Sequence, residues 1–355
     1  MSRILFLVPY PLHNAPSQRF RFEQYFDILR QRGHQYTVQS FLDEATWNIL
    51  YLPGFTLKKF RGILAGFTRR FLVLFRLSNY DFVFIHREAS PVGPPVFEWL
   101  IAKFFRKKII FDFDDAIWLP NTSGENKIAA SLKWHSKTGS ICRWAYRCSC
   151  GNDFLAAYAR KFNKNVVVNP TTIDTQHHHK GLKNQAELPV KIGWTGTHTT
   201  LKYLELLMPV LRKINENLSF TLVVISNKKP ELDFPALEYV PWNKSTEIDD
   251  LLRFHIGVMP LTDDDWSRGK CGFKALQYMS LGIPAVVSPV GVNNKIVDHG
   301  INGFLCDSPE EWEVALKRLL TDTALRQMMG RAAQLKIEQC YSVQSNARNF
   351  LSLFE

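Results

Sequence analysis

The feature that most limits the fold is an alternation of short apolar segments with amphipathic helical segments, repeated in two series along the chain. Apolar segments typical of buried strands occupy 3–8, 36–38, 81–86, 108–113 and 165–168 in the first series. The second series has them at 191–195, 220–225, 255–260 and 284–288. Strands that alternate with helices form a parallel sheet that is covered on both faces. The sequence therefore predicts an α/β protein with two doubly wound parallel-sheet domains.

A polar segment without an apolar period separates the two series. We expect an N-terminal domain at 1–170, a linker at 171–190 and a C-terminal domain at 191–336. In open α/β sheets, ligands bind at the carboxyl ends of the strands. The loops expected to carry function are therefore 9–21, 86–94, 112–118, 193–202, 226–230 and 263–274.

Composition excludes several classes of protein. Hydrophobic residues make up 46% of the chain, so it is not disordered. The six cysteines lack the paired spacing of a disulfide scaffold. The apolar segment at the N-terminus ends at Pro9, too early for a signal peptide, and no apolar run is long enough to cross a membrane. We expect a cytoplasmic protein.

The net charge of +11 lies entirely in the first half of the chain. Residues 1–170 hold 24 basic and 12 acidic side chains, whereas 171–355 hold 20 and 21. Such an excess favours an anionic partner: a membrane surface, a lipid phosphate or nucleic acid. No nucleic-acid-binding motif accompanies the charge, so we expect no nucleic-acid partner.

A segment rich in basic and aromatic residues lies within the first half. Residues 55–77 carry six basic side chains and no acid, with apolar residues at helical spacing, and 103–108 form a second basic cluster. One interpretation is a helix that rests on an anionic membrane surface. The other is a helix that packs its apolar face on a sheet and leaves its charges in solvent. The sequence leaves both open.

Several motifs occur together in an order that is specific in combination. They are Arg19 to His34, Val168-Asn169-Pro170 with Ile173-Asp174, Gly282 to Ser288 followed by Gly291, and Asn302-Gly303-Phe304. This combination resembles glycosyltransferase family four, the group 1 transferases. The resemblance implies the GT-B fold, with two Rossmann-like domains that face a cleft and a C-terminal helix within 337–355 that crosses back to the first domain. It also implies a hexosyltransferase (EC 2.4) that uses a nucleoside-diphosphate sugar with retention and requires no cofactor.

The chain departs from this family where the donor binds. The two glutamates that the family usually carries fall here on Gly269 and Gln277, so Gln277 is expected to accept from the ribose hydroxyls. The family's usual Gly-Arg for the diphosphate falls on Gly196 and Thr197, with Lys202 matching its lysine. Glycine, hydroxyls and a helix N-terminus can still hold phosphate. The alternative is an ordinary capped turn.

The predicted donor site combines these positions with others near them. Lys202 and Lys270 are expected to stabilise the leaving diphosphate. The other expected donor contacts are Gly196, Thr197, His198, Thr199, Trp242, Arg268, Lys274 and Gln277.

A cluster of acids follows the strand at 108–113. Asp114 and Asp115 stand where the family usually has a His-Asp pair, so they are predicted to be catalytic, either on sugar hydroxyls or on the acceptor proton. A second interpretation is that a Mn²⁺ or Mg²⁺ ion binds to the carboxylates of Asp112, Asp114 and Asp115. A third is a strand-end cluster with a capping role.

No metal site is predicted elsewhere. The acids at 263–265 are expected to be solvated, and the histidines at 177–179 are expected to belong to the linker.

In the first domain, an acceptor or phosphate is expected to meet Ser17, Arg19, Arg21 and Glu88, unless the two arginines are ordinary surface residues. The predicted function is transfer of a sugar from a nucleoside-diphosphate donor to a glycan or lipid-linked acceptor in polysaccharide biosynthesis, at the inner face of the membrane. Two alternatives remain: a nucleotide-binding subunit without turnover, and a metal-dependent transferase that uses Asp112, Asp114 and Asp115.

Overall fold

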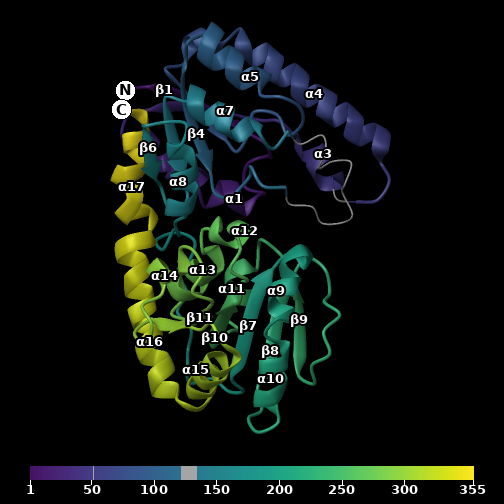
Figure 1. Ribbon diagram of the computed structural model, residues 1–355, viewed down its shortest axis with the longest axis vertical. Helices are drawn as coiled ribbons and strands as arrows, with labels where there is room; N and C mark the ends of the chain where they lie inside the picture. Colours follow the sequence, from purple (N-terminus) through teal and green to yellow (C-terminus); the bar gives the residue numbers. More distant parts are fainter. Residues whose placement is uncertain (51, 121–133) are drawn as a thin grey trace. The chain divides into compact units, whose positions relative to one another are not determined.

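The computed structural model describes residues 1–50, 52–120 and 134–355. The chain divides into two compact units (Figure 1). Unit 1 contains Met1–Thr171 and Asn346–Glu355, and unit 2 contains Thr172–Ser345. Each unit is built around a six-stranded sheet, and the recorded strand pairs are parallel. The predicted α/β fold with two doubly wound sheets is confirmed.

The sheet of unit 1 has the strand order β2-β1-β3-β4-β5-β6. Its strands are β1 (Arg3–Val8), β2 (Gln35–Ser40), β3 (Phe82–His86), β4 (Lys108–Phe113), β5 (Arg147–Cys150) and β6 (Val166–Val168). The apolar runs of β1, β3 and β4 are buried almost throughout, as expected of strands covered on both faces. The order reverses between β1 and β3, which makes the loops after these two strands the switch point of unit 1.

Helices cover both faces of this sheet (Figure 1). The α-helices of unit 1 are α1 (Pro16–Arg19), α2 (Phe26–Gln31), α3 (Glu44–Ile49), α4 (Thr56–Leu74), α5 (Val96–Trp99), α7 (Lys137–Trp144) and α8 (Asp153–Arg160). Short helical turns are η1 (Glu23–Tyr25), η2 (Leu77–Asn79) and η3 (Leu100–Phe104), the last of which continues α5.

The sheet of unit 2 has the order β12-β11-β10-β7-β8-β9, which is the Rossmann order when its strands are counted along the chain. Its strands are β7 (Lys191–Gly196), β8 (Thr221–Ser226), β9 (Leu237–Pro241), β10 (Ile256–Met259), β11 (Ala285–Val287) and β12 (Gly303–Leu305). The order reverses between β7 and β10, so the loops after these strands form the switch point of unit 2.

The helices of unit 2 complete the doubly wound arrangement (Figure 1). They are η5 (His198–Thr200), α9 (Leu201–Glu205), α10 (Met208–Asn215), α11 (Glu247–Leu251), α12 (Asp265–Arg268), α13 (Phe273–Ser280), α14 (Asn293–Ile296), α15 (Pro309–Thr321), α16 (Thr323–Lys336) and η6 (Ile337–Tyr341). The start of α15 follows from its sequence, because Ser308 and Glu311 form a capping box around Pro309.

The chain returns to unit 1 at its C-terminus, as the sequence predicts. Helix α17 (Val343–Leu351) and η7 (Ser352–Phe354) follow η6, and residues 346–355 belong to unit 1. Phe350 stacks on Tyr25 with ring centroids 4.2 Å apart, and Phe354 is buried. Burial of these two rings, together with hydrogen bonds such as that from Asn349 to the Val168 carbonyl, attaches the end of the chain to the first sheet.

The polar segment 171–190, which is expected to be a linker, belongs to unit 2 from Thr172 onward and is ordered by contacts with its helices and turns. The Lys183 amide donates to the Leu281 carbonyl, and Gln185 accepts from the Arg326 guanidinium at 3.2 Å. These contacts are polar, which is why the segment shows no apolar period. In the parts of the chain that the structure describes, no helix is long and apolar enough to span a membrane.

A buried histidine makes the stability of unit 2 depend on pH. His255 is 2% exposed, and its Nδ1 accepts from the Lys191 amide at 3.1 Å. Burial, with the nearby positive charges of Lys183 and Arg326, lowers the pKa of His255 to about 4. The unfolded chain therefore binds this proton first, so stability is present above about pH 6.5 and is lost as the pH falls towards 4.

We expect wild type to lose about 3 kcal/mol of unfolding free energy between pH 7 and pH 4 through this residue alone. His255→Asn keeps a hydrogen-bond acceptor but cannot titrate, so its stability is expected to fall less over that range. Urea unfolding of both proteins at several pH values measures the difference. Parallel curves for the two proteins would show that His255 is not the titrating group.

Candidate functional site

In unit 2, the loop after β7 is a tight turn that leads into a helix. Gly196 ends the strand, and a Cβ atom there would come within 2.5 Å of the Trp194 ring, so only glycine fits. The Thr200 hydroxyl donates to the Thr197 carbonyl at 2.9 Å, and the His198 amide donates to the Asn227 side chain at 2.9 Å. The loop is therefore a hydrogen-bonded turn, but neither the N-cap side chain of η5 nor that of α9 caps its helix. Thr197, His198 and Thr199 are exposed, which leaves them accessible to a ligand.

Two lysines that follow the two switch-point strands, Lys202 on α9 and Lys270 after α12, converge on one aromatic ring. The Lys202 ammonium lies 5.1 Å from the centre of the Tyr203 ring, and the Lys270 ammonium lies 5.8 Å from the same centre. Lys270 also lies over the Trp266 ring at 5.4 Å. The aromatic faces attract both cations and hold them in place. Two positive charges around one ring at the carboxyl edge of the sheet favour a ligand with more than one negative charge.

The other predicted donor residues are distributed around this edge. The Lys274 ammonium lies 5.6 Å from the centre of the Trp194 ring, so it belongs to the same edge. The Trp242 amide donates to the Ser226 carbonyl, which places Trp242 at the end of β8. Gln277 is buried on α13. Arg268 is exposed and makes a bidentate contact with Asp263 at 2.7 and 2.9 Å, so an intramolecular carboxylate already occupies its guanidinium.

The acidic run before Lys270 has structural roles. Asp264 caps α12 by accepting from the Ser267 amide at 2.7 Å. Asp263 and Asp265 pair with Arg268 and are more than half exposed, as predicted for solvated acids.

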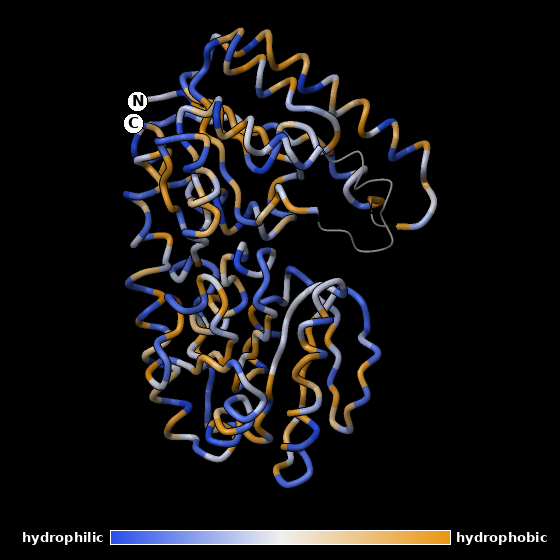
Figure 2. Tube along the Cα trace, in the orientation of Figure 1, coloured by the Kyte–Doolittle hydropathy of each residue, from blue (hydrophilic) through white to orange (hydrophobic). Residues whose placement is uncertain are grey.

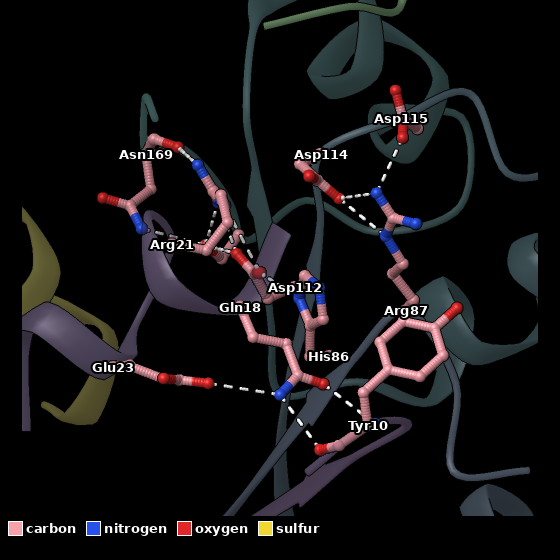
Figure 3. A network of polar contacts seen from close by, with 11 residues as sticks. Tyr10, Gln18, Arg21, Glu23, His86, Arg87, Asp112, Asp114, Asp115 and Asn169 are labelled. Atoms are coloured by element: carbon pink, nitrogen blue, oxygen red, sulfur yellow. Dashed lines mark hydrogen bonds and ion pairs between the residues drawn. The ribbon is translucent and has the colours of Figure 1, made fainter. Parts of the chain in front are cut away.

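In unit 1, Asp112 points into the interior. Its carboxylate pairs with Arg21, accepts from the Ser149 hydroxyl at 2.6 Å and contacts His86 Nδ1 at 2.8 Å (Figure 3). Arg21 also donates to the Asn169 carbonyl. Although burial would raise the pKa of Asp112, the charge of Arg21 and the hydrogen bond with His86 hold it well below its usual range. This buried group joins the carboxyl ends of β3, β4, β5 and β6 to the turn after α1.

Asp114 and Asp115 lie near one another because both contact Arg87 (Figure 3). Arg87 Nε donates to Asp114 Oδ1 at 2.8 Å, and Arg87 Nη2 donates to Asp115 Oδ2 at 2.7 Å. Burial lowers the pKa of Arg87, but the negative charges of Asp114 and Asp115 outweigh this effect and raise the pKa above its usual value. The three side chains are partly exposed at the carboxyl edge of the sheet, where they can reach a ligand.

The backbone at Arg87 is strained. Its φ is 60°, in the left-handed region, and the Glu88 amide donates to the His86 carbonyl across a three-residue turn at 2.7 Å. Arg87 follows β3, and Tyr10 follows β1, so these two residues stand at the switch point of unit 1. Figure 3 shows the Tyr10 ring beside Arg87. Strain in a non-glycine residue is most often kept at functional positions.

The predicted acceptor or phosphate contacts of unit 1 differ in their availability. Arg21 is 1% exposed and paired with Asp112, so the prediction that it meets a phosphate is not supported by its position. Glu88 pairs with the buried Lys137 at 2.7 Å, so its carboxylate holds the loop in place. Arg19 is 9% exposed, and Ser17 is partly exposed on α1. Sequence reasoning fails for Arg21 because a carboxylate 91 residues away neutralises it.

The positions of the acids argue against a metal-dependent transferase built on Asp112, Asp114 and Asp115. Asp112 is directed inward to Arg21 and His86, whereas Asp114 and Asp115 contact Arg87. Within 1–50, 52–120 and 134–355, no group of three His, Cys, Asp or Glu residues could hold a metal ion. His177 and His178 contact Asp174 and Glu247 instead.

Sequence reasoning missed Arg87, Tyr10 and Tyr203. A usable signal existed for the first two, because both directly follow apolar strands of the predicted sheet, where ligands bind. Nothing in the sequence indicates that Tyr203 lies between two lysines that are 68 residues apart.

Comparison with known proteins agrees with this architecture. Sucrose-phosphate synthase from Thermosynechococcus elongatus superimposes with a TM-score of 0.70 at 13% identity, over 100% of this chain and 98% of that one. Anabaena Alr3699/HepE in complex with UDP gives 0.64 at 15% identity, over 99% and 98%. Residues 189–322 match the family described as glycosyl transferases group 1. The chain has the GT-B fold, and residues 189–322 resemble the group 1 glycosyl transferases.

The matched region lies within unit 2 and contains Gly196 to Lys202, Lys270 and Gln277. Spore coat protein SA of Bacillus subtilis (strain 168) is 26% identical over 82 residues. That match spans 22% of this chain and 22% of the length of the curated relative.

Proposed function

We propose that the chain transfers a sugar from a nucleoside-diphosphate sugar to an acceptor hydroxyl, with retention. The observation that carries this proposal is the pair Lys202 and Lys270 on the Tyr203 ring, at the switch point of the unit that resembles the group 1 glycosyl transferases. In the reaction, the bond between sugar C1 and the diphosphate oxygen breaks, and the acceptor oxygen bonds to C1. The acceptor proton passes to the departing phosphate. Each cation that faces the leaving diphosphate lowers the barrier by roughly 2–4 kcal/mol.

The remaining predicted residues have supporting roles in this proposal. The exposed Thr197-His198-Thr199 turn would donate to the diphosphate, and Lys274 and Gln277 would contact the rest of the donor. Asp114 and Asp115, oriented by Arg87, would accept from sugar or acceptor hydroxyls. The UDP named in the HepE complex supports a nucleoside diphosphate as the donor's leaving group.

For the acceptor, we propose a lipid-linked glycan of a surface polysaccharide at the inner face of the membrane, with the protein attached peripherally. The support is the positive charge of the first half of the chain, which 24 basic and 12 acidic residues produce. The acceptor's pyrophosphate and an anionic bilayer both complement that charge.

A nucleotide-binding subunit without turnover is the alternative, because Gly269 and Gln277 replace the two usual glutamates. The first test is a thermal-shift panel of UDP-, GDP-, ADP- and CMP-sugars, with and without Mg²⁺. We expect one donor class to raise the Tm, with little dependence on Mg²⁺. A Tm that no donor raises would contradict the proposal, and a shift seen only with Mg²⁺ would restore the metal-dependent alternative.

A further inference from the structure

Helix α4 and the residue after it carry a stripe of large apolar side chains that faces solvent. Leu57, Phe60, Leu64, Phe71 and Phe75 recur at three-, four- and seven-residue steps, and each is about half exposed or more. Figure 2 shows hydrophobic positions recurring along this helix at the outer side of unit 1. A helix that only covers a sheet buries such a stripe.

The opposite side of α4, which packs on unit 1, has small or polar residues along most of its length and buries Val73 and Leu74 in its last turn. A Cβ atom on Gly62 would come within 2.2 Å of Thr46, and one on Gly66 within 2.6 Å of the Phe41 ring. Arg70 is fully buried and donates to the Val8 and Ala89 carbonyls at 2.7 Å. The core-helix interpretation is therefore wrong for most of the stripe: the helix is attached through two glycines, a buried arginine and the apolar residues of its last turn.

A neighbouring segment extends the exposed apolar surface. Phe97 of α5 lies against Phe67 of α4 with ring centroids 6.1 Å apart, and the two helices lie side by side (Figure 1). On α5 and η3, Val96, Trp99 and Phe104 are 51%, 45% and 70% exposed.

The exposed charges of α4 and of the α5–η3 segment are all basic. Lys58, Arg61 and Arg76 are exposed on or next to α4, and Lys103 and Arg106 are exposed at the end of η3. Residues 55–77 contain no acid, and neither do 99–108. Aromatic and leucine side chains flanked by cations match the boundary between headgroups and acyl chains of an anionic bilayer.

We infer that α4 and the α5–η3 segment bind the surface of an anionic bilayer, with α4 lying in its plane and its apolar stripe inserted. The link between this membrane surface and a lipid-linked acceptor rests on the proposed function. No residue of the donor site takes part in it. A second copy of the chain is a poorer occupant, because a two-fold contact would oppose these cations to themselves.

The test is flotation of the full chain with vesicles of phosphatidylcholine alone or mixed with phosphatidylglycerol, at low and high salt. We expect binding to the anionic vesicles only, weakened by salt. Leu64→Asp removes apolar contact at an exposed position and is expected to lower the partition coefficient roughly tenfold or more. Arg61→Glu with Arg106→Glu is also expected to lower the partition coefficient, because it replaces two positive charges near the anionic headgroups with negative ones.

Matched controls separate this surface from general effects. Leu335→Asp changes an equally exposed leucine on α16, and Arg160→Glu with Arg331→Glu changes exposed arginines elsewhere; both are expected to float like wild type. The inference is overturned if wild type stays unbound at low salt, or if Leu64→Asp and Leu335→Asp behave alike. A dimer in light scattering that Leu64→Asp dissociates, without flotation, would assign the surface to self-association. Donor-induced Tm shifts of the same variants report on the donor site separately.

Discussion

Arg21→Met is expected to lower the free energy of unfolding by about 3–5 kcal/mol, the cost of leaving one member of a buried ion pair without its partner. The Asp112 carboxylate would keep its contacts with Ser149 and His86 but lose the guanidinium that neutralises it. The carboxyl ends of β4 and β6 would also lose the side chain that joins them, because Arg21 donates to the Asn169 carbonyl. Chemical unfolding followed by circular dichroism measures the loss.

Arg30→Met is the control, because Arg30 and its partner Asp27 are both mostly exposed. An exposed pair is worth at most about 1 kcal/mol, so this variant is expected to stay close to wild type. Arg21→Met with Asp112→Leu removes both charges and is expected to be more stable than Arg21→Met alone. If Arg21→Met and Arg30→Met have the same stability, the Arg21–Asp112 pair does not stabilise unit 1.

Lys202→Met and Lys270→Met are each expected to reduce turnover of the donor roughly 100-fold, about 2.7 kcal/mol of transition-state stabilisation. Methionine keeps the apolar stem over Tyr203 and removes only the charge, so the fold is expected to persist. The loss should appear chiefly in kcat, because charge on the diphosphate grows as the bond to the sugar breaks. Steady-state release of the nucleoside diphosphate is the measurement.

Lys213→Met serves as the matched control. Lys213 is 65% exposed on α10 and pairs with Glu313 rather than with a switch-point loop. We expect its turnover and Tm to match wild type. Normal turnover in both Lys202→Met and Lys270→Met would remove the two lysines from the reaction.

Much of the fold is readable from the sequence because parallel strands buried on both faces are continuous apolar runs. Strands β1 and β4 have the predicted bounds, 3–8 and 108–113. The missed strands are short or polar: β12 has three residues, β5 reads Arg-Cys-Ser-Cys, and β9 is a half-buried edge strand. These short or polar segments become strands because they form hydrogen bonds with neighbouring strands. The residues of the segment alone do not reveal those hydrogen bonds.

The candidate site is predictable where position along a strand decides it. Lys202 and Lys270 follow β7 and β10, and their convergence agrees with the rule for carboxyl ends. The rule does not say which side chains turn inward. Arg21 and Asp112 neutralise each other inside unit 1, while Arg87 orients Asp114 and Asp115 at its surface. These pairings join residues 27 to 91 positions apart, so no spacing along the chain reveals them.

The orientation of α4 was equally undetermined. A helical period of aromatic residues does not tell whether the stripe faces the sheet or solvent. Gly62 and Gly66 decide it, because only their side of the helix can approach Thr46 and Phe41.

The most direct test of sugar transfer is to incubate a donor carrying a labelled sugar with the full chain and a lipid-linked acceptor extract, for wild type, Lys202→Met with Lys270→Met, and Lys213→Met. We predict that wild type and Lys213→Met move label into the lipid fraction and release an equal amount of nucleoside diphosphate, while the double variant does neither at a comparable rate. A wild-type chain that binds the donor but neither releases the diphosphate nor transfers label to any acceptor would contradict the account and leave a nucleotide-binding subunit.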